Sequence, residues 1–261
     1  MKLPDSASLV RLALRVRDIE SCLAYYTEVL GLGVVEQDGN RTSIAPADRQ
    51  VVIDLHHEPD APLRPYPCPG LFHFALVVPD RSALGAIFRR LLERNVPLDG
   101  MSDHAVSEAV YLRDPEHNGI ELYRDRPREE WPYDEDGQIA MVTDPLDVDG
   151  LFESATASAE LDAGTRFGHI HLHVRSLQEA DAFYAGTLGL DVTQRSLPGA
   201  LFLSVGGYHH HVAANTWAPT GDVPDGATGL ISYTWRVPSG WSGPDESIRD
   251  PAGADVLFET G

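Results

Sequence analysis

The chain has 261 residues, with 40 acidic side chains against 20 lysines and arginines, and a formal net charge of −20 at pH 7. A chain this acidic repels phosphate backbones, so a nucleic acid is not an expected partner. Lys2 is the only lysine; such a composition is typical of a surface adapted to high salt, although GC-rich coding would also favour arginine over lysine. The length suits one large domain or two modules.

The N-terminal residues and the cysteines indicate the compartment. Met1 to Ser6 lack the basic stretch and the apolar core of a signal peptide. No apolar run approaches the roughly 20 residues that span a bilayer. Cys22 and Cys68 form no CxxC motif, which favours buried thiols in a reducing compartment over the alternative of a disulfide between them. We therefore expect a cytoplasmic protein without membrane association.

The first unit of the chain recurs later in the sequence. The segment from Val16 to Val34 reappears without a gap as Val174 to Val192. In each copy an alternating strand leads into a helix that Asp18 or Ser176 would cap. Gly31 or Gly189 would end that helix, and a strand-like segment follows. The repeat predicts two copies of one structural unit.

A second kind of unit begins at Gly70. Its pattern predicts a strand, a helix around residues 82–94, and strands around 109–113 and 119–124. An echo runs from Gly229 to Phe258, but the segment 238–244 between its ends is too short and too rich in proline and glycine for a helix. The fourth unit is therefore predicted to be truncated, with its helix missing.

Together these patterns predict an α+β fold of four βαβββ units paired into two modules. The first module would span residues 1–125 and the second residues 167–261. Between them, residues 126–166 form a polar, proline-containing connector in which 146–154 is the expected site of a short helix.

One motif links this layout to a known family. It begins at His104, continues through Tyr111 to Asp114-Pro115, and ends at Gly119-Ile120-Glu121. With the four units, it resembles the vicinal oxygen chelate superfamily (glyoxalase, bleomycin resistance and extradiol dioxygenase proteins), and most of all its catechol 2,3-dioxygenase-like members. Ser102 and His117 depart from the family pattern. The resemblance implies half-barrels that cup a divalent metal, and assembly as a homo-oligomer.

The resemblance also implies the metal ligands. The family takes them from the first strand of one unit and from the first and last strands of its partner, which are here His169, His73 and Glu121. Two histidines and a carboxylate form the facial triad of Fe(II) oxygenases, and the same ligands suit Mn(II). Units one and four carry Arg11, Ser232 and Leu257 at these positions. Units two and three should therefore build the active cup, whereas similar two-domain enzymes use units three and four.

Further residues are expected to take part in catalysis. His210 aligns with the family's acid/base histidine, Tyr111 with a tyrosine that hydrogen-bonds substrate oxygen, and His104 with the signature histidine. Read as a strand, residues 208–213 would put His209 and His211 on the opposite side for packing. His171 shares a face with His169 and would line the cup or replace a ligand. Taken singly, Tyr111 could instead be a core or rim aromatic, and His104 could cap or hydrogen-bond a turn.

The leading expectation is an Fe(II)-dependent extradiol dioxygenase that cleaves catechol or a substituted catechol with O2. The first alternative is another metal-dependent reaction of the superfamily, such as glyoxalase or epimerase chemistry. The second is a non-catalytic ligand-binding protein of the bleomycin-resistance kind. An intact triad together with His210 and Tyr111 favours the dioxygenase. The ring substituents, iron against manganese, and the oligomeric state stay open.

Overall fold

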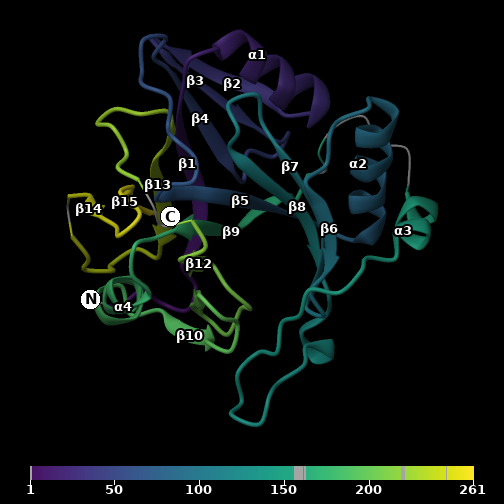
Figure 1. Cartoon of the computed structure of the whole chain (residues 1–261), viewed down its shortest axis with the longest axis vertical. Helices are drawn as coiled ribbons and strands as arrows, with labels where there is room; N and C mark the ends of the chain where they lie inside the picture. The colour runs from purple at the N-terminus through teal and green to yellow at the C-terminus, as the bar shows by residue number, and fades with distance from the viewer. Residues whose placement is uncertain (1, 156–160, 162, 219–220, 245) are drawn as a thin grey trace.

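Two curled sheets form the molecule, with the helices on their outer faces (Figure 1). The computed structural model describes residues 2–155, 161, 163–218, 221–244 and 246–261. The first sheet has the order β14-β15-β13-β1-β4-β3-β2. Its strands are β1 (Ser8–Val16), β2 (Gly33–Asp38), β3 (Arg41–Ala45), β4 (Val52–His57), β13 (Gly229–Val237), β14 (Ile248–Arg249) and β15 (Asp255–Thr260).

The second sheet carries the candidate site and has the order β10-β11-β12-β9-β5-β8-β7-β6. Its strands are β5 (Gly70–Val78), β6 (Gly100–Asp103), β7 (Ser107–Arg113), β8 (Gly119–Asp125), β9 (Arg166–His173), β10 (Asp191–Gln194), β11 (Ala200–Ser204) and β12 (Val212–Asn215). The helices are α1 (Ile19–Ala24), α2 (Arg81–Glu93), α3 (Val148–Ser154) and α4 (Leu177–Asp181), with π-helical turns η1 (Tyr25–Val29) and η3 (Ala182–Thr187) and a 3-10 turn η2 (Arg128–Glu130).

The sheets combine units from the two halves of the chain. Units one and four supply the first sheet, and units two and three supply the second. The junction in the second sheet is the antiparallel pair β5 and β9, in which His73 faces His171 and Ala75 faces His169. The expected pairing of units two and three is therefore present, and the predicted α+β architecture of βαβββ units is confirmed.

Two hydrogen bonds hold neighbouring units of each half together. Tyr26 in η1 donates to Asp114 Oδ2 over 2.9 Å, and Tyr184 in η3 donates to Asp250 Oδ2 over 2.8 Å. Both tyrosines and both carboxylates are buried. The repeat seen in the sequence is thus also a repeat of a buried tyrosine–aspartate contact, which links unit one to two and unit three to four.

The helix signals of the two repeats are confirmed, with one difference. Asp18 and Ser176 accept hydrogen bonds from the third residue of their helices, and Gly31 and Gly189 have the left-handed φ values of 80° and 72°. Each helix, however, is α-helical only in its first half and becomes a π-helical turn in its second. The apolar spacing that predicted one continuous helix does not distinguish the two forms.

Unit four is shortened as expected, and a short helix lies in the segment that follows unit two. No helix lies between β13 and β14 in the described part of that segment. The connector contains α3, which packs against α2 (Figure 1). Cys22 and Cys68 are both buried and free. Among the helices described, none is both long and apolar enough to cross a membrane.

Alternation along the strands separates the core from the cup. On β5, Phe74, Leu76 and Val78 point into the main hydrophobic core under the helices. His73 and Ala75 occupy the other face, which curls into the concave side of the second sheet. On β8, Ile120 and Leu122 face the same core, so the intervening Glu121 faces the cup. Polar ligands are thereby placed on a face that does not interrupt the core.

Candidate active site

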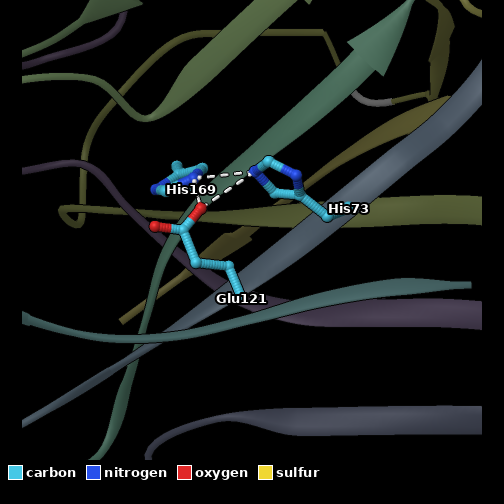
Figure 2. A group of neighbouring side chains, drawn as sticks. All are labelled: His73, Glu121 and His169. Carbon is cyan, nitrogen blue, oxygen red and sulfur yellow. Dashed lines mark hydrogen bonds and ion pairs between the residues drawn. The ribbon is translucent and has the colours of Figure 1, made fainter. Parts of the chain in front are cut away.

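Three buried side chains meet on the concave face of the second sheet. His73 comes from β5, Glu121 from β8 and His169 from β9. The Nε2 atoms of the two imidazoles are 3.2 Å apart, and each lies 3.0 Å from Glu121 Oε2. Figure 2 shows the three polar atoms pointing at one another from three adjacent strands. The structure thus brings together the three residues expected to be ligands, which are 96 positions apart at the widest.

The spacing of these atoms fits a divalent metal. Ligand atoms about 2.1 Å from one ion lie about 3.0 Å apart at octahedral right angles and about 3.4 Å apart at tetrahedral angles. The observed separations of 3.0, 3.0 and 3.2 Å match one face of an octahedron. Three ligands on one face leave the opposite positions open. Among the described residues this is the one cluster of histidine, cysteine and acidic groups with such spacing.

The charges of the cluster also suit a cation. Burial lowers the pKa of His169 to about 4, although the charge of Glu121 acts in the opposite direction, so the imidazole is neutral at pH 7. Burial acts to raise the pKa of Glu121, but the two neighbouring histidines outweigh it and hold that pKa well below its usual value. The site therefore presents the neutral nitrogen of His169 and an ionised carboxylate, the protonation states that metal binding requires.

A close backbone approach helps to set this geometry. Gly119 on β8 pairs with His73 on β5. A Cβ at residue 119 would lie 2.1 Å from the carbonyl oxygen of Phe72, which a side chain could not do without moving the strands apart. The glycine that precedes Ile120-Glu121 therefore lets the two ligand-bearing strands lie side by side.

The other sheet has no comparable cluster among its described residues. Arg11 on β1 forms an ion pair with the buried carboxylate of Asp54 on β4, at 2.7 Å. Ser43 donates to the same carboxylate over 2.5 Å. Ser232 and Leu257 lie on β13 and β15 of that sheet. Units one and four thus hold an arginine–aspartate pair where units two and three hold the metal-site residues.

His171 lies in the cup without joining the triad. It lines the cavity, and its Nε2 lies 2.8 Å from the side-chain amide nitrogen of Asn215 on β12. The same amide accepts a hydrogen bond from His173 Nδ1 through its oxygen, at 2.6 Å. All three histidines of β9 are buried on one face, as strand alternation predicts. Asn215 holds the two that are not in the triad.

On one wall of the cup, His104 and Tyr111 form a hydrogen-bonded pair. His104 Nδ1 lies 2.5 Å from the carbonyl oxygen of Val142, which can only accept, so Nδ1 carries the proton. In this tautomer Nε2 accepts from the Tyr111 hydroxyl, 2.7 Å away. Burial raises the pKa of Tyr111 well above its usual value, with Glu121 adding to the effect, so the phenol stays protonated. A phenol oxygen held in this way is available to accept from a bound ligand.

On the opposite wall, the segment around His210 differs from the expected strand. The strand β12 begins only at Val212, and residues 208–211 form an irregular bend. His209 therefore does not point away from His210: the two Nδ1 atoms are 2.7 Å apart. Only His211 turns away, toward Trp235 of the other sheet. Two adjacent glycines with left-handed φ, Gly206 and Gly207, precede the bend, and this signal could have indicated that the strand had ended.

A chain of hydrogen bonds runs from Asp125 to His210. His209 Nε2 lies 3.0 Å from Asp125 Oδ1, and because a carboxylate only accepts, that nitrogen carries the proton. The carboxylate thus turns Nδ1 of His209 toward His210, and we assign Nδ1–H of His210 as the donor to it. Nε2 of His210 is left with a free lone pair. Burial and the surrounding imidazoles hold the pKa of His210 well below its usual value, so the ring is neutral.

The triad lines one cavity of about 760 Å³. It contains the three triad residues together with His104, Tyr111 and His210, which brings every sequence-predicted site residue into one place. The ring of His210 lies 4.0 Å from that of His169, between centroids. The cavity volume falls in the range of about 300–1,000 Å³ that is usual for small-molecule sites.

Comparisons with known proteins agree with this architecture. Residues 8–122 match the model of the Glyoxalase/Bleomycin resistance protein/Dioxygenase superfamily. The Catechol-2,3-dioxygenase of Bacillus subtilis (strain 168) is 41% identical over 231 residues, which cover 86% of this chain and 81% of that protein. The chain belongs to this superfamily. The expectation of a dioxygenase-type oxidoreductase is confirmed at the level of enzyme class.

Solved structures of the superfamily show the same fold. A structure from Bacillus subtilis subsp. subtilis str. 168 superposes with a TM-score of 0.67 at 15% identity and covers 97% of this chain and 84% of that one. Glyoxalase I from Zea mays superposes with a TM-score of 0.59 at 14% identity, over 97% of this chain and 92% of that one. At these identities the likeness concerns the fold alone.

Three features around the cavity were not expected from the sequence. Asp125 and His209 form the hydrogen-bond chain behind His210. The connector, read as a linker, supplies residues 141–143 to the cavity wall. It is held there by Val142, which bonds to His104, and by the carbonyl oxygen of Met141, which accepts from Gln194. The periodic pattern of apolar residues does not predict such contacts, because they join a loop to strands far away in the chain.

Proposed function

We propose that this protein is an Fe(II)-dependent extradiol dioxygenase that opens the ring of a catechol with O2. The observation that carries the proposal is the triangle of His73, His169 and Glu121, whose spacing fits one face of an octahedron and leaves the other face for ligands. A 41%-identical relative named Catechol-2,3-dioxygenase supports the same reaction. Mn(II) suits the same ligands and is the alternative ion.

The reaction needs no further reductant. A carbon–carbon bond beside the diol breaks, both oxygen atoms of O2 enter the product, and catechol supplies all the electrons. The metal, when bound, supplies a Lewis-acidic centre at which a chelating diol and O2 can meet. As metal ligands, two neutral imidazoles and one carboxylate would leave a divalent ion with a single net positive charge, which suits a catechol that has lost one proton.

His210 and Tyr111, beside the triad, would bind or transfer the hydroxyl protons of catechol. Nε2 of His210 has a free lone pair and lines the cavity, so it can accept the proton of a catechol hydroxyl and return it later in the reaction. On the facing wall, the oxygen of Tyr111 is held by His104 and can accept a hydrogen bond from substrate. A neutral imidazole of low pKa is in its proton-accepting form before substrate arrives.

The carbonyl chemistry of glyoxalase-type enzymes has less support. Such sites generally use a second carboxylate on the last strand of the partner unit, and here a bend of three histidines, 209–211, occupies that region. Among the described histidine, cysteine and acidic side chains, none adds a fourth ligand atom to the triad. The similarity to glyoxalase I concerns the fold and does not extend to this feature.

A direct test is aerobic incubation of Fe(II)-reconstituted protein with catechol, followed by absorbance and an oxygen electrode. The proposal expects a yellow ring-opened product and uptake of O2. Reconstituted protein that binds one iron per chain but consumes no oxygen with any catechol would refute it and leave the binding-only alternative.

The chain from Asp125 through His209 predicts a positioning role for His209. Replacing His209 with leucine removes the acceptor for Nδ1–H of His210, so we expect kcat to fall about 10–100-fold, the usual cost of losing such a supporting hydrogen bond. Metal content and KM for catechol should change less than twofold. His209→Asn, whose amide oxygen can accept in place of Nδ1, should recover part of kcat. A purely structural role predicts instead that both variants lose stability and metal together.

A further inference from the structure

The cavity is larger than a single catechol ring needs. Its volume of about 760 Å³ lies in the upper part of the range for drug-sized ligands. A diol held at the triad would reach the proposed hydrogen-bond acceptor Tyr111 on one wall and the proposed acid/base His210 on the other. Space remains toward the mouth, beyond the groups that would hold the diol. This space must be filled by water or by a substituent on the ring.

One wall of the cavity is largely aromatic. Phe72 packs edge-on against Trp217 with ring centroids 6.0 Å apart, and His171 lies 5.5 Å from the same tryptophan. Phe202 completes this wall beside His171 and His210. Aromatic faces at these separations form a surface against which an apolar group or another ring can pack.

Three hydrophobic side chains at the mouth of the cavity are partly exposed to solvent. Trp217 is 49% exposed, Val142 40% and Leu197 37%, and all three line this one cavity. Exposed apolar groups scattered singly need no explanation, but a set gathered around one opening is typical of a ligand site. A bound apolar substituent would cover them.

The cavity offers no free positive charge. Arg113 is the one lysine or arginine among the described residues that line it, and its Nε lies 2.6 Å from the carboxylate of Asp99. A carboxylate on the substrate ring would have to displace Asp99 or stay unpaired beside apolar groups, which is costly. The net charge of −20 opposes an anionic substrate further.

From the size, the aromatic lining and the lack of a free cation, we propose that the substrate is a catechol bearing an uncharged apolar substituent at least as large as a ring, an aryl or long alkyl group, and not a carboxylated catechol. This inference rests on the proposed ring cleavage. The substituent would pack against Phe72, Trp217 and Leu197 while the diol occupies the triad.

The test compares unsubstituted catechol, 3- and 4-phenylcatechol and 3,4-dihydroxybenzoate with the Fe(II)-loaded enzyme. One methylene in an apolar pocket is worth about 10–200-fold in kcat/KM, so the better phenylcatechol should exceed catechol by at least tenfold, and the benzoate should fall below catechol. Anaerobic calorimetry should give the same order of Kd. Equal kcat/KM for all four, or a preference for the benzoate, would overturn the substrate class.

Two variants test whether the substituent binds at the mouth of the cavity. Trp217→Ala and Leu197→Ser should each lower the ratio of phenylcatechol to catechol kcat/KM by about tenfold. Trp241→Ala, a matched change at a tryptophan that packs on Phe258 in the other sheet, should leave the ratio unchanged. A ratio unaffected by both mouth variants would contradict the assigned pocket. Failure of the ring cleavage itself would appear differently, as absent turnover of every catechol, and calorimetry would still report which catechol binds best.

Discussion

Replacing His73, His169 or Glu121 with alanine is expected to abolish stoichiometric metal binding while leaving the fold intact. A facial triad has no redundant ligand, and loss of a supporting hydrogen bond alone already costs about 10–100-fold in metal affinity. Loss of a ligand should cost more, so each variant should retain less than a tenth of the wild-type iron after desalting. Elemental analysis measures the metal, and circular dichroism and thermal unfolding measure the fold.

His56 provides the matched control for this experiment. It lies at the end of β4 in the sheet that has no such cluster among its described residues, so His56→Ala should keep full iron content. Glu121→Ala removes the one carboxylate of the triad and is the most informative of the three variants. Full iron content in Glu121→Ala would show that the metal, if bound, is held elsewhere.

Turnover is expected to depend on His210 although metal binding does not. His210 lies beside the triad but outside it, and its Nε2 is the acceptor that the hydrogen-bond chain leaves free. General acid–base assistance is typically worth about 10²–10⁴ in rate. His210→Phe, which keeps a ring of similar shape against Phe202 and His169, should lower kcat by about that factor. Stopped-flow or steady-state kinetics with catechol measures it.

The accompanying measurements separate proton transfer from binding. His210→Phe should keep its iron and its anaerobic affinity for catechol, and Tyr111→Phe should show a smaller fall in kcat, because its oxygen is proposed to accept a hydrogen bond and not a proton. Undiminished ring cleavage by His210→Phe would remove the acid/base assignment. Loss of iron in the same variant would indicate that His210 is a ligand.

Local signals and the repeat were sufficient to predict most of the fold. The caps at Asp18 and Ser176 and the glycines at 31 and 189 act within one helix, so their chemistry is visible in a short window of sequence. The pairing of units two and three followed from the ligand positions: Arg11 on β1 cannot contribute to a metal site, whereas His73 and His169 on adjacent strands can.

The contacts that were missed depend on tertiary structure. The bend at 208–211 puts His209 against His210, whereas strand alternation would have separated them. Residues 141–143 reach the cup because the connector folds back over β6 and β10, which nothing in its polar composition reveals. The low pKa of His210 follows from burial among other imidazoles, and burial is known only once the chain has folded.

Oxygen stoichiometry tests the central claim most directly. Fe(II)-loaded protein is mixed with a limiting, measured amount of catechol in an oxygen electrode cell, and the ring-opened product is quantified by mass spectrometry with ¹⁸O2. The account predicts one O2 consumed per catechol, a product heavier than catechol by both oxygen atoms, no hydrogen peroxide, and no reaction in Glu121→Ala. Formation of peroxide with a quinone, or uptake that persists in Glu121→Ala, would contradict ring cleavage at the triad of His73, His169 and Glu121.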